Sequence, residues 1–351
     1  MYDYVIIGGG IAGCTLAYRL ISCNKKVLVV DNSTNNISSQ VAAGIVNPLT
    51  GKRTALSWNA AEIFDELHPF YQELEQQTQS SFFTQLPTYK LFDSIFEQNE
   101  WLNKQEIQGY NPFIESGIQH LDKHLVNNPF GALEISKTGR LNIPVFLKSM
   151  HQWLQDRNAF SNLLFQFEDL EFDNLIVRTS QWKAKNLIFC DGASASNNPF
   201  FNYLPHKPVH GELLEIEMQG FYKDRIINKG IFILPTENQK YLVGATYNWK
   251  LITPLLTTEG REELELKLSQ LCKLNYQVLN HRAGIRPASN DRRPYLGTHP
   301  KYQNLYILGG LGSKGVSLLP FLSKIFTDYL LFNKELPREV DICRVKETYK
   351  D

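Results

Sequence analysis

Cysteine is scarce in this sequence, and its few copies are scattered. The 351 residues hold five, none in a C-x-x-C pair, at positions Cys14, Cys23, Cys190, Cys272 and Cys343. An odd and widely spaced set argues against a disulfide framework and against a thiolate metal site. We therefore expect a protein of a reducing compartment, the cytoplasm, that binds no metal.

The chain also lacks an excess of charge of either sign. Its 36 basic residues balance its 36 acidic residues. The broad basic surface of a dedicated nucleic-acid-binding protein is therefore not expected, although a local patch stays open. The charge balance gives no support to tRNA as a partner.

A long apolar run that could cross a membrane is missing as well. The most apolar late stretch, residues 316–332, carries Lys324 and Asp328 and is interrupted by Pro320, so it fails as a membrane span. The first residues run straight into a strand-like stretch without a basic region or cleavage site. We expect no targeting segment and no membrane partner. Repeats, heptads and low-complexity tracts are absent too, which excludes solenoids and coiled coils.

Short apolar runs are present instead, and four of them look alike. They cover residues 4–7, 26–30, 186–189 and 304–308, and each ends at Gly or Asp. Such runs are typical of parallel strands covered on both faces. A helical stripe over residues 11–22 lies between the first two runs, which makes a βαβ unit. The four runs predict one parallel sheet assembled from distant parts of the chain.

The remaining segments have a different character. Residues 56–141 contain helical stretches such as 60–74, residues 206–249 alternate like antiparallel strands, and a helix is expected over 259–274. The length suits about two domains of roughly 150 residues each. We predict an α/β fold: a Rossmann-type nucleotide-binding domain with a parallel central sheet, and an inserted α+β domain with a mostly antiparallel sheet. The predicted boundaries are 1–55, 142–205 and 284–351 for the first domain, and 56–141 with 206–283 for the second.

A glycine fingerprint follows the first run. Residues 8–13 read GGGIAG, which contains G-x-G-x-x-G after a strand and at the start of a helix. Gly8 permits the tight turn, Gly10 lets the backbone approach a pyrophosphate, and Gly13 lets helix and strand pack closely. Asp31, at the end of the second run, is placed to accept hydrogen bonds from ribose hydroxyls. The fingerprint predicts a dinucleotide and leaves FAD and NAD open.

A second glycine turn, residues 309–315, follows the last run and opens a helical stretch over 316–331. A helix N-terminus there would face a negative group. Because one phosphate cradle suffices for one dinucleotide, the second turn indicates another electron-rich target, and a reduced flavin suits it. The alternative is a strand-to-helix turn without a ligand.

With these landmarks the sequence resembles the D-amino-acid-oxidase-like family of FAD-dependent oxidoreductases, which includes glycine oxidase, sarcosine oxidase and related amine oxidases. The resemblance covers residues 4–31, 38–47 (SSQVAAGIVN), 186–193, 210–214 and 283–319. The last block is the most specific, because it joins a G-x-R-P…D…P-x-x-G pattern to a strand and a glycine-rich helix start. Within the family the chain looks most like the FAD-containing half of the bifunctional enzyme that finishes a tRNA wobble-uridine modification, which has a basic residue where Lys314 stands.

The resemblance implies non-covalent FAD and assigns residues to it. The ADP part would lie on the first fingerprint, the ring on an alanine-glycine segment, and its pyrimidine side on the second turn. The expected cofactor-binding residues are Gly8, Gly10, Ile11, Ala12, Gly13, Asp31, Ala42, Ala43, Gly44, Gly192, Gly310, Gly312, Ser313, Lys314 and Gly315.

The resemblance also implies residues that act on the substrate. Arg286 matches the arginine that grips a substrate carboxylate in glycine-oxidase-like members, and a guanidinium fork suits that role; the alternative is a structural arginine paired with Asp291 or a carbonyl. Lys314 would place positive charge near the ring. Tyr247, like Trp249, is a candidate pocket wall or else a core aromatic. A further arginine of glycine-oxidase-like members is replaced here by Ser313-Lys314.

Three functions follow as hypotheses. The first is an FAD-dependent oxidoreductase acting on CH–NH or CH–NH2 groups of a small amine or amino acid, with hydride passing to the flavin. The second is an oxidoreductase that removes a carboxymethyl group from a modified wobble uridine in tRNA. The third is a flavin-binding protein without turnover. The sequence indicates neither the electron acceptor nor the oligomeric state.

Overall fold

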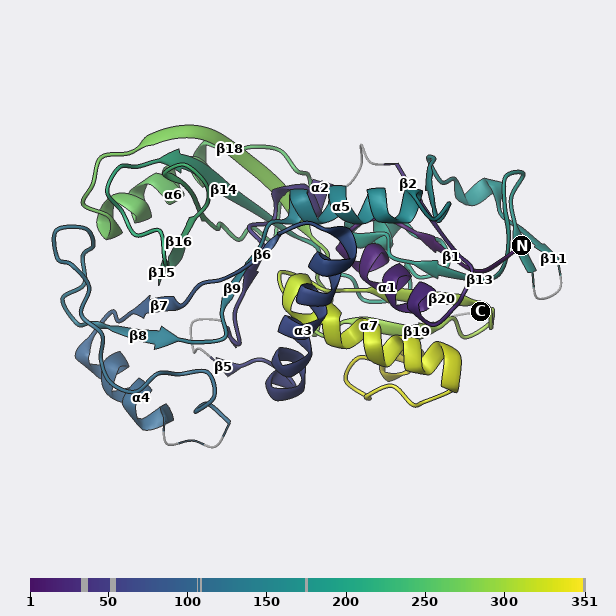
Figure 1. The fold of residues 1–351 in the computed structure, drawn as a ribbon, viewed down its shortest axis with the longest axis horizontal. Coiled ribbons are helices and arrows are strands. Elements are labelled where there is room, and N and C mark those ends of the chain that lie inside the picture. Colours follow the sequence, from purple (N-terminus) through teal and green to yellow (C-terminus); the bar gives the residue numbers. More distant parts are fainter. Residues whose placement is uncertain (33–36, 51–54, 106, 108, 174–175, 350–351) are drawn as a thin grey trace.

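A computed structural model gives the fold, and it describes residues 1–32, 37–50, 55–105, 107, 109–173 and 176–349. The molecule is elongated and has two parts side by side, each built on one large sheet (Figure 1). Both labelled ends of the chain lie on the part that holds the parallel sheet.

The first sheet confirms the parallel strands expected from the apolar runs. Strand β1 (Tyr2–Ile7) pairs in parallel with β2 (Val27–Asp31) on one side and β13 (Lys183–Phe189) on the other, and β13 pairs in parallel with β20 (Leu305–Gly309). The sheet is completed by β10 (Phe160–Asn162), β11 (Glu171–Asp173), β12 (Ile176–Arg178) and β19 (Tyr295–Thr298).

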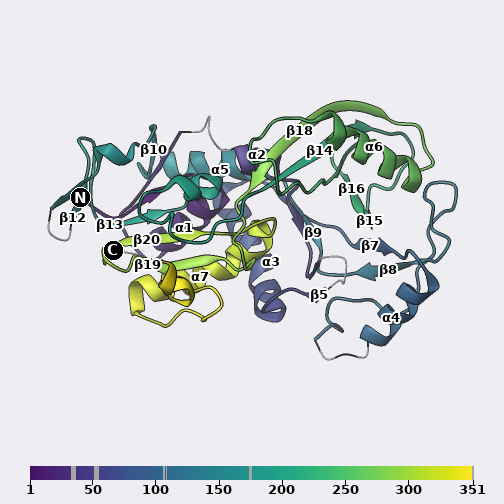
Figure 2. The ribbon, with the colours of Figure 1, turned by 180° about the vertical axis from the view of Figure 1, so that it is seen from behind.

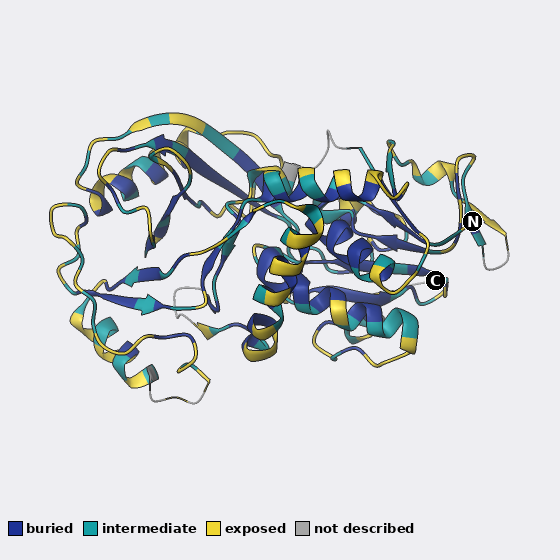
Figure 3. Cartoon of the chain, viewed as in Figure 1, coloured by how far each residue is buried: buried dark blue, intermediate teal, exposed yellow. Residues whose placement is uncertain are grey.

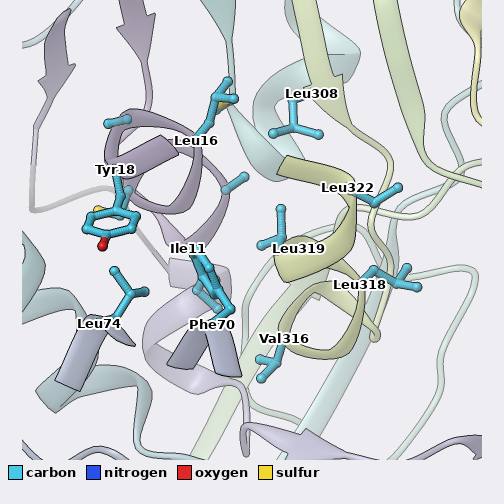
Figure 4. Close-up of a cluster of buried hydrophobic side chains, with 14 of the residues drawn as sticks. Ile11, Leu16, Tyr18, Phe70, Leu74, Leu308, Val316, Leu318, Leu319 and Leu322 are labelled. Atoms are coloured by element: carbon cyan, nitrogen blue, oxygen red, sulfur yellow. The ribbon is translucent and has the colours of Figure 1, made fainter. Parts of the chain in front are cut away.

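Helices cover one face of this sheet and form the largest hydrophobic cluster. They are α1 (Ile11–Ser22), α3 (Ala60–Thr78), α5 (Ile143–Gln155) and α7 (Gly315–Phe332). Figure 4 shows Ile11 of α1 next to Phe70 of α3, with Val316 and Leu319 of α7 on the other side and Leu16 of α1 above, toward Leu308. The opposite face carries a second apolar cluster that contains Val5, Leu187, Phe189 and Ile307. Burial on both faces explains why these strands read as unbroken apolar runs.

Helix α7 confirms the helical stretch expected over residues 316–331. It continues through Pro320, whose carbonyl accepts from Ser323 Oγ at 3.1 Å and from Arg19 at 3.3 Å. Its length and mean hydropathy would suffice for a membrane span, yet half of it is buried inside the protein, where it packs on α1 and α3. Helix α3, assigned by sequence to the second domain, shares this core. The domain boundaries themselves stay a prediction.

The second sheet is mostly antiparallel, as expected. Its order is β18 (Gln277–Arg286), β14 (Val209–Glu217), β17 (Lys240–Gly244), β16 (Ile231–Pro235), β15 (Ile226–Lys229), β7 (Thr88–Leu91) and β8 (Ala132–Ile135), with one parallel pair between β15 and β7. Helix α6 (Thr258–Leu271) packs on β14, and α4 (Ile95–Gln105) lies at the outer end of this part, as the view from behind also shows (Figure 2).

Short elements connect the two parts. They are α2 (Ile37–Val41), β3 (Ile45–Val46), β4 (Leu49–Thr50), β5 (Ala55–Leu56), β6 (Phe83–Gln85) and β9 (Gly139–Leu141). The 3₁₀ turns η1 (Phe167–Asp169), η2 (Gly192–Asn197) and η3 (Ile342–Thr348) follow or flank strands of the first sheet. Strand β3 pairs with β9, and α2 packs on β18. Figure 3 shows dark buried residues along the strands of both sheets, with exposed residues on the outer faces of the helices. The junction therefore brings the segment around Ala42 against the inner face of the second sheet.

Candidate functional site

The predicted glycine turns meet at one edge of the parallel sheet. Gly8 follows β1, Gly192 follows β13 shortly after its end, and Gly310 follows β20, and these three strands are adjacent and parallel. Ligands of open parallel sheets bind outside the carboxyl ends of the strands. The edge where these turns gather is therefore the candidate cofactor site.

The first turn fits a pyrophosphate. Gly8 has φ +101°, and a Cβ at Gly8 would collide with the Cys190 carbonyl, while one at Gly13 would collide with the Gly8 carbonyl. Gly10 is the N-cap of α1, where no side chain caps the helix. The backbone N–H groups of Ile11 and Ala12 at the start of α1 are therefore not capped by a side chain, and N–H groups of this kind bind anions.

The acid at the end of β2 flanks this turn, as the fingerprint requires. A Cβ added to Gly9 would lie 2.9 Å from Asp31 Cβ. His151, on α5, approaches from another direction, with Nε2 2.7 Å from the Gly9 carbonyl oxygen. The residues present fit the nucleotide end of a dinucleotide, with Asp31 beside the turn.

The second turn also presents an uncapped helix. Gly310 and Gly312 have φ +68° and +57°, Ser313 is exposed, and Lys314 is the N-cap of α7, which begins at Gly315. No side chain caps α7. The Gly312 N–H donates to the Pro287 carbonyl at 2.8 Å. This bond ties the turn to the G-x-R-P element, so the structure brings two predicted regions together.

The alanine-glycine segment lies beside the same element. Ser38 Oγ donates to the Ile285 carbonyl at 2.6 Å, and a Cβ at Gly284 would contact the Val41 side chain. Gly44 has φ +78°, and its carbonyl accepts from the Leu141 N–H at 2.9 Å. Ala42 is exposed and Ala43 half-buried. Small side chains held this rigidly suit the close approach of a flat ring.

Arg286 is held by backbone carbonyls. Its guanidinium donates to the His210 oxygen at 3.2 Å and the Thr246 oxygen at 3.1 Å. A Cβ at Gly211 would collide with it, so the glycine provides its space. Burial lowers the pKa of Arg286. No described carboxylate forms an ion pair with Arg286. Asp291, the acid considered for that role, pairs with Arg344 instead, at 2.8 Å. Of the two structural roles considered, carbonyl binding occurs and pairing with Asp291 does not.

Tyr247 completes the surroundings of this arginine. The Arg286 guanidinium lies 4.0 Å from the centre of the Tyr247 ring. Tyr247 is 57% exposed and Trp249 is 45% exposed, so neither is a core aromatic. The structure thus brings Arg286 and Tyr247 together at an accessible surface.

Lys314 lies in a cationic neighbourhood. Its Nζ is 3.5 Å from the buried Ser57 Oγ. Burial, followed by the charges of Arg293 and Arg292, lowers the pKa of the Lys314 ammonium. Positive charge therefore gathers beside the uncapped start of α7, where an anionic group would be stabilised.

Sequence reasoning missed a buried polar cluster on the face of β14 turned away from Arg286. The Glu212 carboxylate is buried on the opposite face of β14, where it accepts from Thr257 Oγ1 at 2.6 Å and lies 2.7 Å from His281 Nε2. His210 is also buried, with Nε2 2.9 Å from the Leu255 carbonyl. Alternation along β14 could have placed these side chains on one face, but not their partners. Among the described residues no group of three His, Cys, Asp or Glu is placed to hold a metal.

Comparison with known proteins agrees with this geometry. Residues 3–329 match the family model described as FAD dependent oxidoreductase. The chain is 22% identical over 357 residues to a glycine oxidase of Pseudomonas aeruginosa, covering 93% of this chain and 94% of that one. It is 23% identical over 399 residues to the tRNA 5-methylaminomethyl-2-thiouridine biosynthesis bifunctional protein of Legionella pneumophila, covering 96% of this chain and 55% of that protein. The fold is similar to that of glycine oxidase from Bacillus cereus, with a TM-score of 0.80 and 20% identity, covering 95% and 96% of the two chains.

Proposed function

The chain belongs to the family of FAD-dependent oxidoreductases, and from this premise we propose that it oxidises a C–N bond of a small amine or amino acid. When bound, FAD would supply the hydride acceptor. The predicted cofactor, fold class and enzyme class are confirmed at the level of the family, and the glycine oxidases among the relatives support the C–N bond as the point of attack.

The observation that carries the proposal is the state of Arg286. Two of the five N–H groups of a guanidinium go to the His210 and Thr246 carbonyls. The remaining donors have no described carboxylate partner, although burial disfavours an uncompensated cation. A substrate carboxylate supplies the missing partner through a bidentate contact. The two carbonyls fix the plane of the fork, so the carboxylate is oriented as well as bound.

The other residues assist by position and charge. Tyr247 covers Arg286 and shields its contact with the carboxylate from water. Lys314 and the uncapped start of α7 place positive charge on the side of the second turn, where negative charge on a reduced ring is stabilised. The substrate amine must be neutral when it gives up hydride, and no described side chain needs to become covalently attached.

An anaerobic titration tests this proposal. The flavin-loaded protein is mixed with glycine, sarcosine and a panel of D-amino acids, and the loss of flavin absorbance is followed. We expect bleaching by at least one carboxylate-bearing amine. Bleaching by modified tRNA alone would overturn the proposal. If no amine in a widened panel bleaches the flavin, the third hypothesis, a flavin-binding protein without turnover, would be favoured instead.

A second candidate, oxidation of a carboxymethylaminomethyl-uridine in tRNA, is favoured by one surface observation. The Trp249 ring lies 5.3 Å from the Lys207 ammonium and 6.0 Å from the Arg292 guanidinium, and Tyr247 is exposed beside it. Exposed aromatic rings among cations are a stacking surface for unpaired bases. This local patch exists despite the neutral balance of the whole chain.

Trp249→Ala separates the two candidates. If tRNA is the substrate, the variant should raise the KM for modified tRNA about tenfold, since base stacking contributes roughly 1–3 kcal/mol. Phe172→Ala, an exposed aromatic in the distant strand β11, serves as the matched control. Unchanged bleaching by tRNA in Trp249→Ala would remove this patch from substrate recognition.

A further inference from the structure

A cleft of about 300 Å³ lies at the junction of the two parts, apart from the candidate substrate arginine. Its walls come from the segment after α2, the start of α5, the inner face of the second sheet and the β16–β17 turn. The lining residues used below are Ala42, Arg140, Asn142, Glu215, Lys240 and Arg282. Figures 1 and 2 both place α2 and the start of α5 at this junction.

Two arginines in this cleft have a buried nitrogen without a hydrogen-bond partner among the described residues. They are Arg140 and Arg282, and the atom is Nε in both. Arg282 pairs with Glu215 at 3.3 Å, whereas Arg140 forms no ion pair with a described carboxylate. Buried polar atoms in native proteins are nearly always partnered. Two such atoms in one cleft indicate a missing partner.

The charges around Arg140 point to the sign of that partner. Burial lowers the pKa of Arg140, and Arg282 lowers it further, against the opposing effects of Glu237 and Glu215. Lys240 adds a third positive charge at the rim. The carboxylates of Glu215 and Glu237 also line the cleft, but the three cations outnumber them, so an added anion would be stabilised there.

A helix end opens into the same cleft. Asn142 is the N-cap of the 13-residue helix α5, but its side chain makes no cap hydrogen bond, and the first residues of α5 line the cleft. The start of a helix carries partial positive charge; of the two α5 residues that line the cleft, Ile143 has an N–H group and Pro144 has none. The helix end and the two guanidinium groups thus converge on one volume.

We propose that this cleft is a second ligand site, which binds a small oxyanion, a carboxylate or a phosphate group, between Arg140, Arg282 and the start of α5. Both groups match the guanidinium fork. The site is separate from Arg286, because Arg282 precedes it by four residues on β18, about 13 Å along a strand. Ala42, a predicted flavin contact, lines one wall, so a bound oxyanion would lie close to the flavin segment. The proposal does not depend on the identity of the oxidised substrate.

Titration calorimetry on the flavin-loaded protein tests it, with inorganic phosphate in one arm and malonate in the other. We expect saturable binding in at least one arm, and the better ligand identifies the source of the oxyanion. Arg140→Gln and, separately, Arg282→Gln should each weaken that binding at least tenfold. Arg286→Leu removes only the carboxylate contact proposed for the substrate site, so phosphate binding, and the malonate binding that depends on Arg140, should stay within twofold in it and in Arg178→Gln of strand β12.

The stability of the variant without ligand provides a second readout. Because an unpartnered buried cation is a cost to the folded state, Arg140→Gln should unfold at the same temperature as the unaltered protein or at a higher one. No binding of either anion to the flavin-loaded protein would overturn the proposal. So would binding that survives both cleft variants, and so would binding lost only in Arg286→Leu.

Discussion

Replacing Arg286 is the sharpest test of the proposed chemistry. In Arg286→Leu the carboxylate loses a bidentate, charge-assisted contact. Removing one member of a buried hydrogen-bonded charge pair costs about 2–5 kcal/mol. A middle value of about 3 kcal/mol corresponds to roughly a 100-fold rise in the Kd of a carboxylate-bearing amine. Arg286→Lys keeps the charge but loses the fork, so we expect a smaller rise of about tenfold.

The assay is an anaerobic stopped-flow titration, in which the dependence of flavin reduction on amine concentration separates binding from the reduction step. The control is chemical: an amine of similar size without a carboxylate should bind equally weakly to the unaltered protein and to Arg286→Leu. Flavin content and the near-ultraviolet spectrum check the fold, because the variant frees the His210 and Thr246 carbonyls. Equal losses for both kinds of amine, or an unchanged Kd, would refute the carboxylate role.

Three further predictions concern the cofactor turn and two buried acids. Gly13→Ala should abolish retention of FAD, because the added Cβ would collide with the Gly8 carbonyl. The control is Gly117→Ala, at a position with φ +87° and no neighbour within 4 Å, which should keep FAD and lower the free energy of unfolding by about 1–2 kcal/mol. The ratio of flavin to protein absorbance distinguishes the two variants. Burial raises the pKa of Asp191 from 3.8 to about 6, so the folded state holds this proton more tightly than the unfolded chain. The free energy of unfolding should therefore fall as pH rises from about 4 to 6. Urea unfolding should show a weaker dependence of this free energy on pH for Asp191→Asn, and the same dependence in both proteins would contradict the argument. Glu212→Ala should lower the free energy of unfolding by about 3 kcal/mol, because it removes the carboxylate that contacts Thr257 and His281. The control Glu263→Ala, at an exposed ion pair, should change it by less than about 1 kcal/mol. Similar changes in both variants would contradict the role given to Glu212.

The sequence predicted the features that depend on local pattern. Helix α1 begins and ends where the stripe of Ala12, Leu16 and Leu20 indicated, and the parallel strands follow from runs that need cover on both faces. The glycine turns were visible because few residues other than glycine suit a positive φ or a backbone approach as close as that of Gly13 to Gly8. These signals are contained within a few neighbouring residues.

The rest depended on contacts between distant residues. The sequence predicted a helix through Pro320, but it could not show that the Pro320 carbonyl would accept from Ser323 and from the distant Arg19. Helix α3 has an apolar stripe that does not say which core it joins; α7 provides the surface. The cleft arginines, Arg140 and Arg282, come from strands 140 residues apart, and neither has a motif. A local sequence pattern does not predict contacts between residues so far apart in the chain.

The order of strands in the parallel sheet has a consequence for biosynthesis. Strand β13 is flanked by β1 from the start of the chain and by β20 from near residue 305. At about 5–20 residues per second, the ribosome needs roughly 6–23 s to add the chain between β13 and β20. During that interval the edge of β13 is open and the second glycine turn has not been made, so an edge prone to wrong pairing must be kept from other chains. Binding of a flavin between the two glycine turns would therefore protect the sheet only after β20 has been made.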